Sequence, residues 1–72
     1  MTTVQLVEFL NAEFGPGTVR RGTIYWWLRK GRITANGWPS KHFNPIFFTS
    51  EQVAAVRKFV AIVVAARKAQ RT

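Results

Sequence analysis

Apolar residues recur with the spacing of an α-helix in three segments of the 72-residue chain. The first segment begins at Thr2 or Thr3, where Thr2 and Gln5 have the spacing of a capping box, and the run GPG at 15–17 ends it. Its apolar stripe consists of Val4, Val7 and Leu10 or Phe14, with Leu6 beside it. The pattern predicts an amphipathic helix that stops before Gly15.

The second helical segment extends from about Val19 to Lys30, with Thr18 as the expected N-cap and Gly31 just beyond the C-terminus. At about 100° per residue, one side of this helix holds three large apolar residues, which we assign to the core. These core residues are Ile24, Trp27 and Leu28. The other side carries Arg21, Gly22, Tyr25, Trp26 and Arg29, followed by Lys30 and Arg32. The helix therefore has one side that packs and one side that combines rings with cations.

Residues 32–49 change to two short β-prone runs, RIT and IFF, separated by the loop-like run ANGWPSKHFNP. This pattern predicts an antiparallel hairpin with a long tip. Thr49 and Gln52 form a second capping-box pair, which opens the longest predicted helix at about residues 50–70. The expected core stripe of that helix is Val53, Val56, Phe59, Val60 and Val63.

The predicted order is therefore helix, turn, helix, hairpin, helix within a single domain of residues 1–72. This order predicts an α+β, mostly helical fold of the winged helix-turn-helix type. In that architecture the second helix enters the DNA major groove and the hairpin forms a wing.

The charge pattern adds a candidate partner. The chain has 11 Lys and Arg against 3 Asp and Glu, a formal net charge of +8. Residues 1–13 contain two acids and no base, whereas residues 14–50 contain six bases and no acid. Solubility alone does not require such segregation, so the pattern favours a polyanionic partner, with double-stranded DNA ahead of an anionic membrane.

Several other classes of protein are disfavoured. The chain has no cysteine and a single histidine, His42, so we expect no disulfide, zinc site or other cofactor. The three carboxylates, Glu8, Glu13 and Glu51, are scattered, and no nucleophile–base pair is visible, so an enzyme is not expected. The N-terminus has no signal-peptide pattern, and the apolar run at 59–66 is far too short to span a bilayer. We therefore expect a cytoplasmic protein.

The start of the second helix supplies candidate DNA contacts. Arg20 and Arg21 lie in the first turn, where cations oppose the helix dipole, so a phosphate or a guanine edge explains them better. Gly22 costs roughly 1 kcal/mol relative to alanine, which close approach of a partner would explain. Trp26 either contacts DNA or covers the hairpin. Arg29 and Lys30 either contact DNA or interact with the negative end of the helix dipole.

The run TIYWWLRKGRI at 23–33, followed by NPIFFTSEQV at 44–53, resembles the MerR-like winged helix, most closely that of the phage excisionases, or recombination directionality factors. The resemblance covers about residues 18–56 and includes the aromatic pair Phe47–Phe48 before a capped helix. It implies a factor that binds and bends DNA near phage attachment sites, so that a tyrosine-recombinase integrase excises rather than integrates. It also implies partner contacts with that integrase and with neighbouring copies on DNA.

The same resemblance implies contacts from the start of the second helix, the positions of Tyr25 and Trp26, and a wing tip at Lys41 and His42. The chain departs from the family at Gly22, where a side chain usually reads a base, and at Tyr25 and Trp26, where arginines are common. These departures favour readout of phosphates and DNA shape. The complete predicted DNA-binding set is Thr18, Arg20, Arg21, Gly22, Thr23, Tyr25, Trp26, Arg29, Lys30, Arg32, Lys41 and His42.

The last helix has an apolar stripe wider than a core-facing helix needs. The extra positions are Ala55, Phe59, Ile62 and Ala66. They either complete the core or contact a protein, which would be the integrase or a neighbouring copy in a head-to-tail filament. A small MerR-like transcriptional repressor is the alternative function. A basic membrane-active protein is a further alternative, although the two capping boxes favour a stable fold without a membrane partner.

Overall fold

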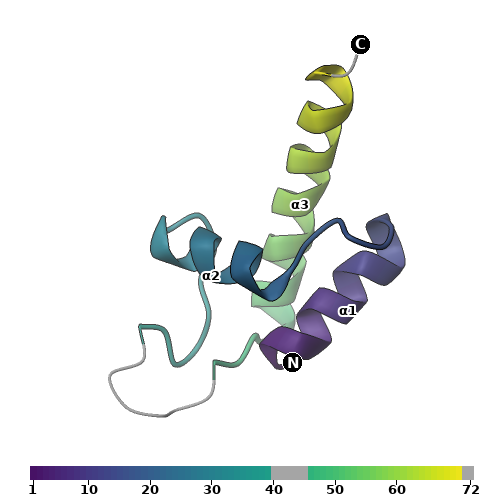
Figure 1. Ribbon diagram of the computed structural model, residues 1–72. Helices are drawn as coiled ribbons and strands as arrows, with labels where there is room; N and C mark the ends of the chain where they lie inside the picture. The colour runs from purple at the N-terminus through teal and green to yellow at the C-terminus, as the bar shows by residue number, and fades with distance from the viewer. Residues whose placement is uncertain (40–45, 71–72) are drawn as a thin grey trace.

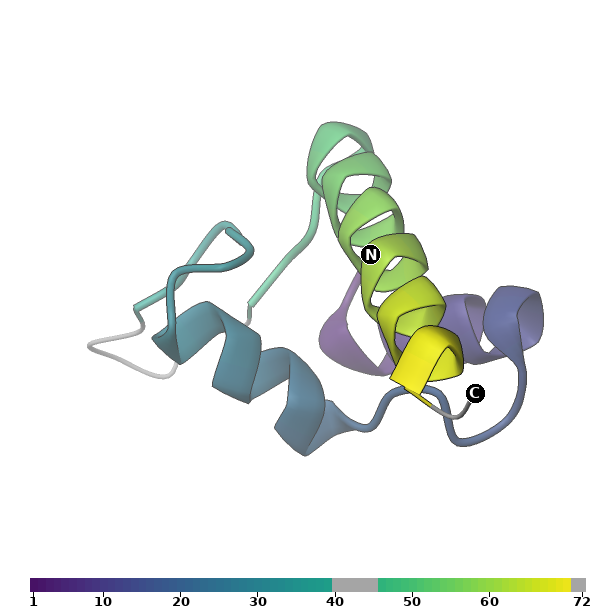
Figure 2. The same cartoon turned by 90° about the horizontal axis from the view of Figure 1, so that it is seen from above.

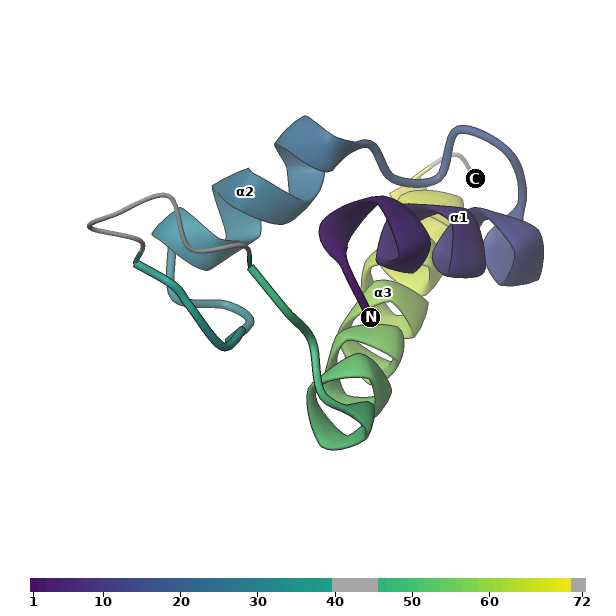
Figure 3. The same cartoon turned by 90° about the horizontal axis from the view of Figure 1, so that it is seen from below.

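The computed structural model describes residues 1–39 and 46–70, which contain three helices: α1 (Thr3–Phe14), α2 (Arg21–Arg29) and α3 (Ser50–Gln70). Helix α3 is the longest of the three, and the two shorter helices lie beside its N-terminal part (Figure 1). Views from above and below show α1 crossing α3, with α2 to one side of α3 (Figures 2 and 3). The prediction of a small, mostly helical fold is confirmed.

Helix α1 begins and ends as the sequence predicts. The Thr2 hydroxyl accepts a hydrogen bond from the Gln5 N–H at 3.2 Å, and the Gln5 side chain accepts one from the Thr2 N–H at 2.9 Å. The predicted apolar stripe is wrong in one respect, because Val4 is 48% exposed while Leu6 and Leu10 are fully buried. The helix is rotated so that Thr3, Leu6 and Leu10 face the core.

Helix α2 starts at Arg21, two residues later than predicted. The preceding Val19 is held by the side chain of Asn11, which accepts from the Val19 N–H and donates to the Val19 carbonyl, both at 3.0 Å. Thr18 is not the N-cap, since its hydroxyl donates to the Gly15 carbonyl at 2.6 Å. The assignment of Ile24, Trp27 and Leu28 to the core is confirmed.

The predicted β-hairpin is not formed as two strands. In residues 1–39 and 46–70 the pairing is limited to isolated bridges of Phe47, one with Asn36 and one with Thr2. Asn36 and Phe47 exchange two backbone hydrogen bonds, of 2.8 and 2.9 Å. At the start of the run RIT, the Arg32 N–H is bonded to the Trp27 carbonyl at the end of α2 instead of to a partner strand. The predicted wing tip, Lys41 and His42, lies outside the described residues.

Helix α3 begins at Ser50 as predicted. The second capping box is present, with the Thr49 hydroxyl accepting from the Gln52 N–H at 3.2 Å and the Gln52 side chain accepting from the Thr49 N–H at 2.9 Å. The predicted stripe faces the core, with Val56 and Val60 fully buried. Partly buried residues of α3, Val53, Phe59 and Val63, pack around them. The C-terminal part of α3 extends past α1 and α2 (Figure 1).

The extra apolar strip predicted on α3 divides between core and surface. Phe59 packs on the core, where its ring meets Trp27 edge-on at a centroid distance of 4.9 Å. Ala55 and Ala66 are exposed, and Ile62 is 68% exposed. One of the four candidate protein-contact residues therefore belongs to the core, and the other three remain on the surface.

Candidate nucleic-acid interface

Four residues of α2 form a continuous exposed ridge, which we call the outer face of α2. They are Gly22, Tyr25, Trp26 and Arg29. Their spacing of i, i+3, i+4 and i+7 places them on one side of the helix, opposite the buried Ile24, Trp27 and Leu28. The prediction that one side of this helix packs while the other faces outward is confirmed.

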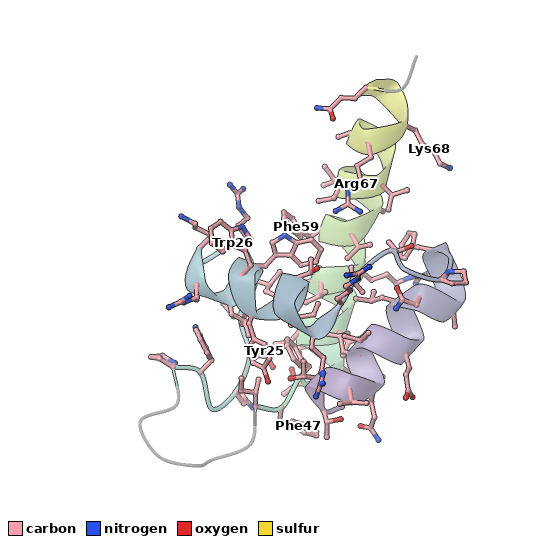
Figure 4. The ribbon with its side chains drawn as sticks, in the orientation of Figure 1. Tyr25, Trp26, Phe47, Phe59, Arg67 and Lys68 are labelled. Atoms are coloured by element: carbon pink, nitrogen blue, oxygen red, sulfur yellow. The ribbon has the colours of Figure 1, made fainter. Side chains whose placement is uncertain are left out.

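The outer face presents two aromatic rings to solvent. Trp26 is 55% exposed and Tyr25 is 39% exposed. Figure 4 shows that the two side chains leave the outer face in different directions, as adjacent residues of a helix do. The ring centroid of Tyr25 lies 6.4 Å from that of Trp38, in the segment that follows α2. Tyr25, rather than Trp26, therefore contacts the segment predicted as a hairpin. The Trp26 ring instead forms a cation–π contact with the Lys30 ammonium, which lies 4.7 Å from the ring centroid.

Cations surround these rings. Arg20, Arg21, Arg29, Lys30 and Arg32 are all exposed. Among the described residues none of them forms a salt bridge, and the first turn of α2 contains no acid. The Lys30 ammonium lies over the Trp26 ring. The positive charge around α2 is therefore available to an anion.

The N-terminal part of the outer face is bare backbone. A Cβ built on Gly22 would meet nothing within 4 Å, and Gly22 has an ordinary helical backbone rather than a positive φ. The fold of the free chain therefore does not require glycine at this position. An external partner that approaches the backbone closely would supply the reason.

Two of the predicted DNA contacts have structural roles. The Thr23 hydroxyl accepts a hydrogen bond from the Arg20 N–H at 3.3 Å, which stabilises the first turn of α2. The Thr18 hydroxyl is bonded to the Gly15 carbonyl and closes the turn between α1 and α2. Both side chains are half-buried. These threonines shape the start of α2, and the arginines beside them carry its charge.

Sequence reasoning missed Asn11, the residue that positions the start of α2. Its side-chain amide binds both backbone groups of Val19 and so fixes the segment that leads into Arg20. Asparagine is a weak helix former, and its place one turn before GPG was a usable signal of a side chain that reaches out of the helix.

The other basic helix, α3, is partly neutralised. Arg57 forms a bidentate ion pair with Glu13 of α1, with Nε 2.7 Å from Oε2 and Nη2 2.5 Å from Oε1. The hydrogen bond to Glu13, together with its negative charge, raises the pKa of the Arg57 side chain. Arg57 therefore ties α3 to α1 and does not extend the free charge around α2.

Other kinds of site find no support in the described part of the chain. Residues 1–39 and 46–70 contain no group of three His, Cys, Asp or Glu side chains that could hold a metal ion. No helix in these residues has the length and apolar character needed to cross a membrane.

No family model, curated protein or solved structure matches the chain.

Proposed function

We propose that the chain is a double-stranded DNA-binding protein that places the outer face of α2 against the DNA. One observation carries this proposal: an exposed ridge with two rings lies among five exposed cations, none of them in a salt bridge among the described residues. Apolar rings exposed together with such charge suit a partner that offers phosphates and base edges at once.

The dimensions of α2 support insertion into the major groove. With its side chains an α-helix is about 10–12 Å across, close to the roughly 12 Å width of that groove. Helices α1 and α2, joined by residues 15–20, act as a helix-turn-helix, with α2 as the recognition helix. Arg20 and Arg21 bind phosphates or a guanine edge at the N-terminal end, while Tyr25 and Trp26 contact base edges and sugars.

The more specific role is that of an accessory factor that bends phage DNA and directs an integrase toward excision. The resemblance of residues 18–56 to phage excisionases supports this role. The exposed Ala55, Ile62 and Ala66 then provide the contact with the integrase or with a neighbouring copy on the DNA.

A gel-shift titration tests the proposal at both levels. The chain is titrated on a long DNA that carries a phage attachment arm and on a scrambled DNA of equal length, at two salt concentrations. A ladder of cooperative complexes with anomalous mobility on the attachment DNA alone is the expected result. A single complex on a promoter-like site would replace the excision role by a repressor role. Equal smearing on both DNAs that vanishes with salt would contradict specific recognition by α2.

A further inference from the structure

A second basic surface lies where the C-terminal part of α3 meets the turn between α1 and α2. Figure 2 shows the end of α3 above this turn, and Figure 4 labels its two cationic residues, Arg67 and Lys68. A cleft of about 300 Å³ opens between the two elements. It is lined by Pro16, Gly17, Thr18, Val64, Arg67 and Lys68.

Arg67 is held in place at this cleft. It follows Val60 and Val63 at i+7 and i+4, so it continues the core stripe of α3 beyond the point where the core ends. Its Nη1 donates to the carbonyl of Thr18 at 3.2 Å, across 49 residues of sequence. One of the five guanidinium N–H groups is used in this bond, which leaves the others to bind an acceptor in the cleft.

Within the described residues, no carboxylate neutralises the charge of the cleft. None of its six lining residues is acidic. Glu13, at the C-terminal end of α1, is already bound to Arg57. Lys68 forms no salt bridge within the described residues. Two adjacent cations therefore face a turn whose glycine-rich backbone leaves space for a small anion.

The position of the cleft relates it to the recognition helix. Thr18, which accepts the bond from Arg67, lies two residues before Arg20, the N-cap of α2. An anion in the cleft would thus lie beside the end of α2 that carries Arg20 and Arg21. On double-stranded DNA, successive phosphates follow one another along the backbone, so one binding surface can hold several of them.

We propose that Arg67 and Lys68, with the turn at 15–18, bind a phosphate of the same DNA whose groove receives α2. This contact rests on the proposed function and adds a second point of attachment, from an element that does not enter the groove. The terminal turn of α3 acts as a clamp on the DNA backbone. The surface is distinct from Ala55, Ile62 and Ala66, which are left free for a protein partner.

The test measures how DNA affinity depends on salt for the complete chain and for charge-neutralising variants. Each phosphate contact contributes about 0.9 to the slope of log affinity against log salt concentration. Lys68→Gln is expected to lower the slope by about 0.9, which corresponds to a loss of about eightfold in affinity at 0.1 M salt. Arg67→Gln should have a similar effect on the slope. Thermal unfolding of both variants shows whether the turn is retained without the bond to Thr18.

Lys58→Gln is the matched control. It removes the same charge from the same helix, but Lys58 lines a different hollow, with Glu13, Phe14, Ala54, Arg57 and Ala61. Its slope should stay that of the unmodified chain. If Lys68→Gln and Lys58→Gln change the slope equally, or not at all, while the unmodified chain binds DNA, the clamp is refuted and the proposed function stands. If the unmodified chain binds no DNA, both proposals are refuted together.

Hydroxyl-radical footprinting supplies a second readout that a purely structural role of Arg67 would not produce. The unmodified chain should protect a backbone position at the edge of the site, next to those protected by the N-terminal end of α2. Lys68→Gln should expose that position alone. The clamp would be contradicted if Lys68→Gln lost protection across the whole site, or if it lost no protection at any position.

Discussion

Helices α1 and α2 are both short and both bury one side, yet their exposed sides differ in kind. The outer side of α1 shows Phe9, which is 39% exposed, the same fraction as Tyr25 on α2. An exposed ring by itself therefore does not distinguish the two surfaces. The charges do, because α1 carries Glu8 and Glu13 without a base, whereas α2 and its flanks carry five bases without an acid. The two surfaces therefore differ in the charges around an exposed ring, and not in the exposure of the ring itself.

The first turns of the two helices differ in the same direction. Thr2 and Gln5 cap α1 reciprocally, which satisfies two backbone N–H groups. At the N-cap of α2 stands Arg20, whose side chain has no acceptor, and Arg21 follows in the part of the helix where cations oppose the dipole. The first turn of α1 therefore has residues that stabilise the helix, whereas the first turn of α2 has cations that an anion could bind.

The largest effect is expected when the charge of α2 is removed. Replacing Arg20 and Arg21 together by Gln should remove two phosphate contacts, lower the salt slope by about 1.8 and reduce affinity at 0.1 M salt about sixtyfold. Glu8→Gln on α1 should leave the slope unchanged. Fluorescence titration of labelled duplex DNA at several salt concentrations measures both. A slope for the double variant equal to that of Glu8→Gln would mean that Arg20 and Arg21 contact no phosphate.

The next largest effect is expected from the two exposed rings. Trp26→Ala should weaken DNA binding by about 2 kcal/mol, roughly thirtyfold, as large aromatic residues at the centre of an interface commonly do. Phe9→Ala, which removes a ring from the acidic helix, should leave affinity unchanged. The same titrations apply, and circular dichroism confirms that both variants fold. A loss of affinity in Phe9→Ala as large as that in Trp26→Ala would remove the distinction between the faces.

A smaller and opposed pair of effects is expected from Gly22. Gly22→Ala should raise the free energy of unfolding by about 1 kcal/mol, because alanine is the better helix former and the added Cβ meets nothing. The same methyl group should weaken DNA binding by separating the backbone from its partner. Ala12→Gly on α1 should lower stability by a similar amount and leave binding unchanged. Urea unfolding measures the stability of each variant, and DNA titration measures its affinity. If Gly22→Ala binds DNA as tightly as the unmodified chain, the DNA does not approach the backbone closely at this position.

The smallest effect concerns the N-caps. Arg20→Ser supplies the acceptor that α2 lacks and should stabilise the free protein by about 0.5 kcal/mol, while it weakens DNA binding through the lost charge. Thr2→Ser, at the N-cap of α1, exchanges one good capping residue for another and should change neither. Urea unfolding monitored by circular dichroism is sensitive enough for this comparison. A destabilised Arg20→Ser would show that the arginine contributes to the fold.

The features that follow from local chemistry were predictable from the sequence. Both capping boxes, the end of α1 before Gly15, the start of α3 at Ser50 and the burial of Ile24, Trp27 and Leu28 are as expected. Each depends on residues within one helical turn of one another. The exposure of Tyr25, Trp26 and the neighbouring cations followed from the same periodicity.

The features that were missed depend on contacts between distant residues. Val19 was predicted as helical, but it is held outside α2 by Asn11, eight residues earlier. In the described part of residues 32–49, single bridges of Phe47 to Asn36 and to Thr2 stand in place of the predicted strands, and the Arg32 N–H is bonded at the end of α2. On α1, periodicity alone allowed two adjacent stripes, and only packing against the other helices selects Leu6 and Leu10 over Val4.

The amide of Asn11 has a consequence for how the chain can vary. Because both of its bonds go to the backbone of Val19, they impose no requirement on the side chains of the residues between them. The turn at 15–18 can therefore change its sequence without moving the start of α2, within the limits set by Gly15 and Gly17 at positive φ and by the hydrogen bond from the Thr18 hydroxyl to the Gly15 carbonyl. One asparagine thus separates two traits that can vary independently: the direction of α2 and the sequence of the turn in front of it.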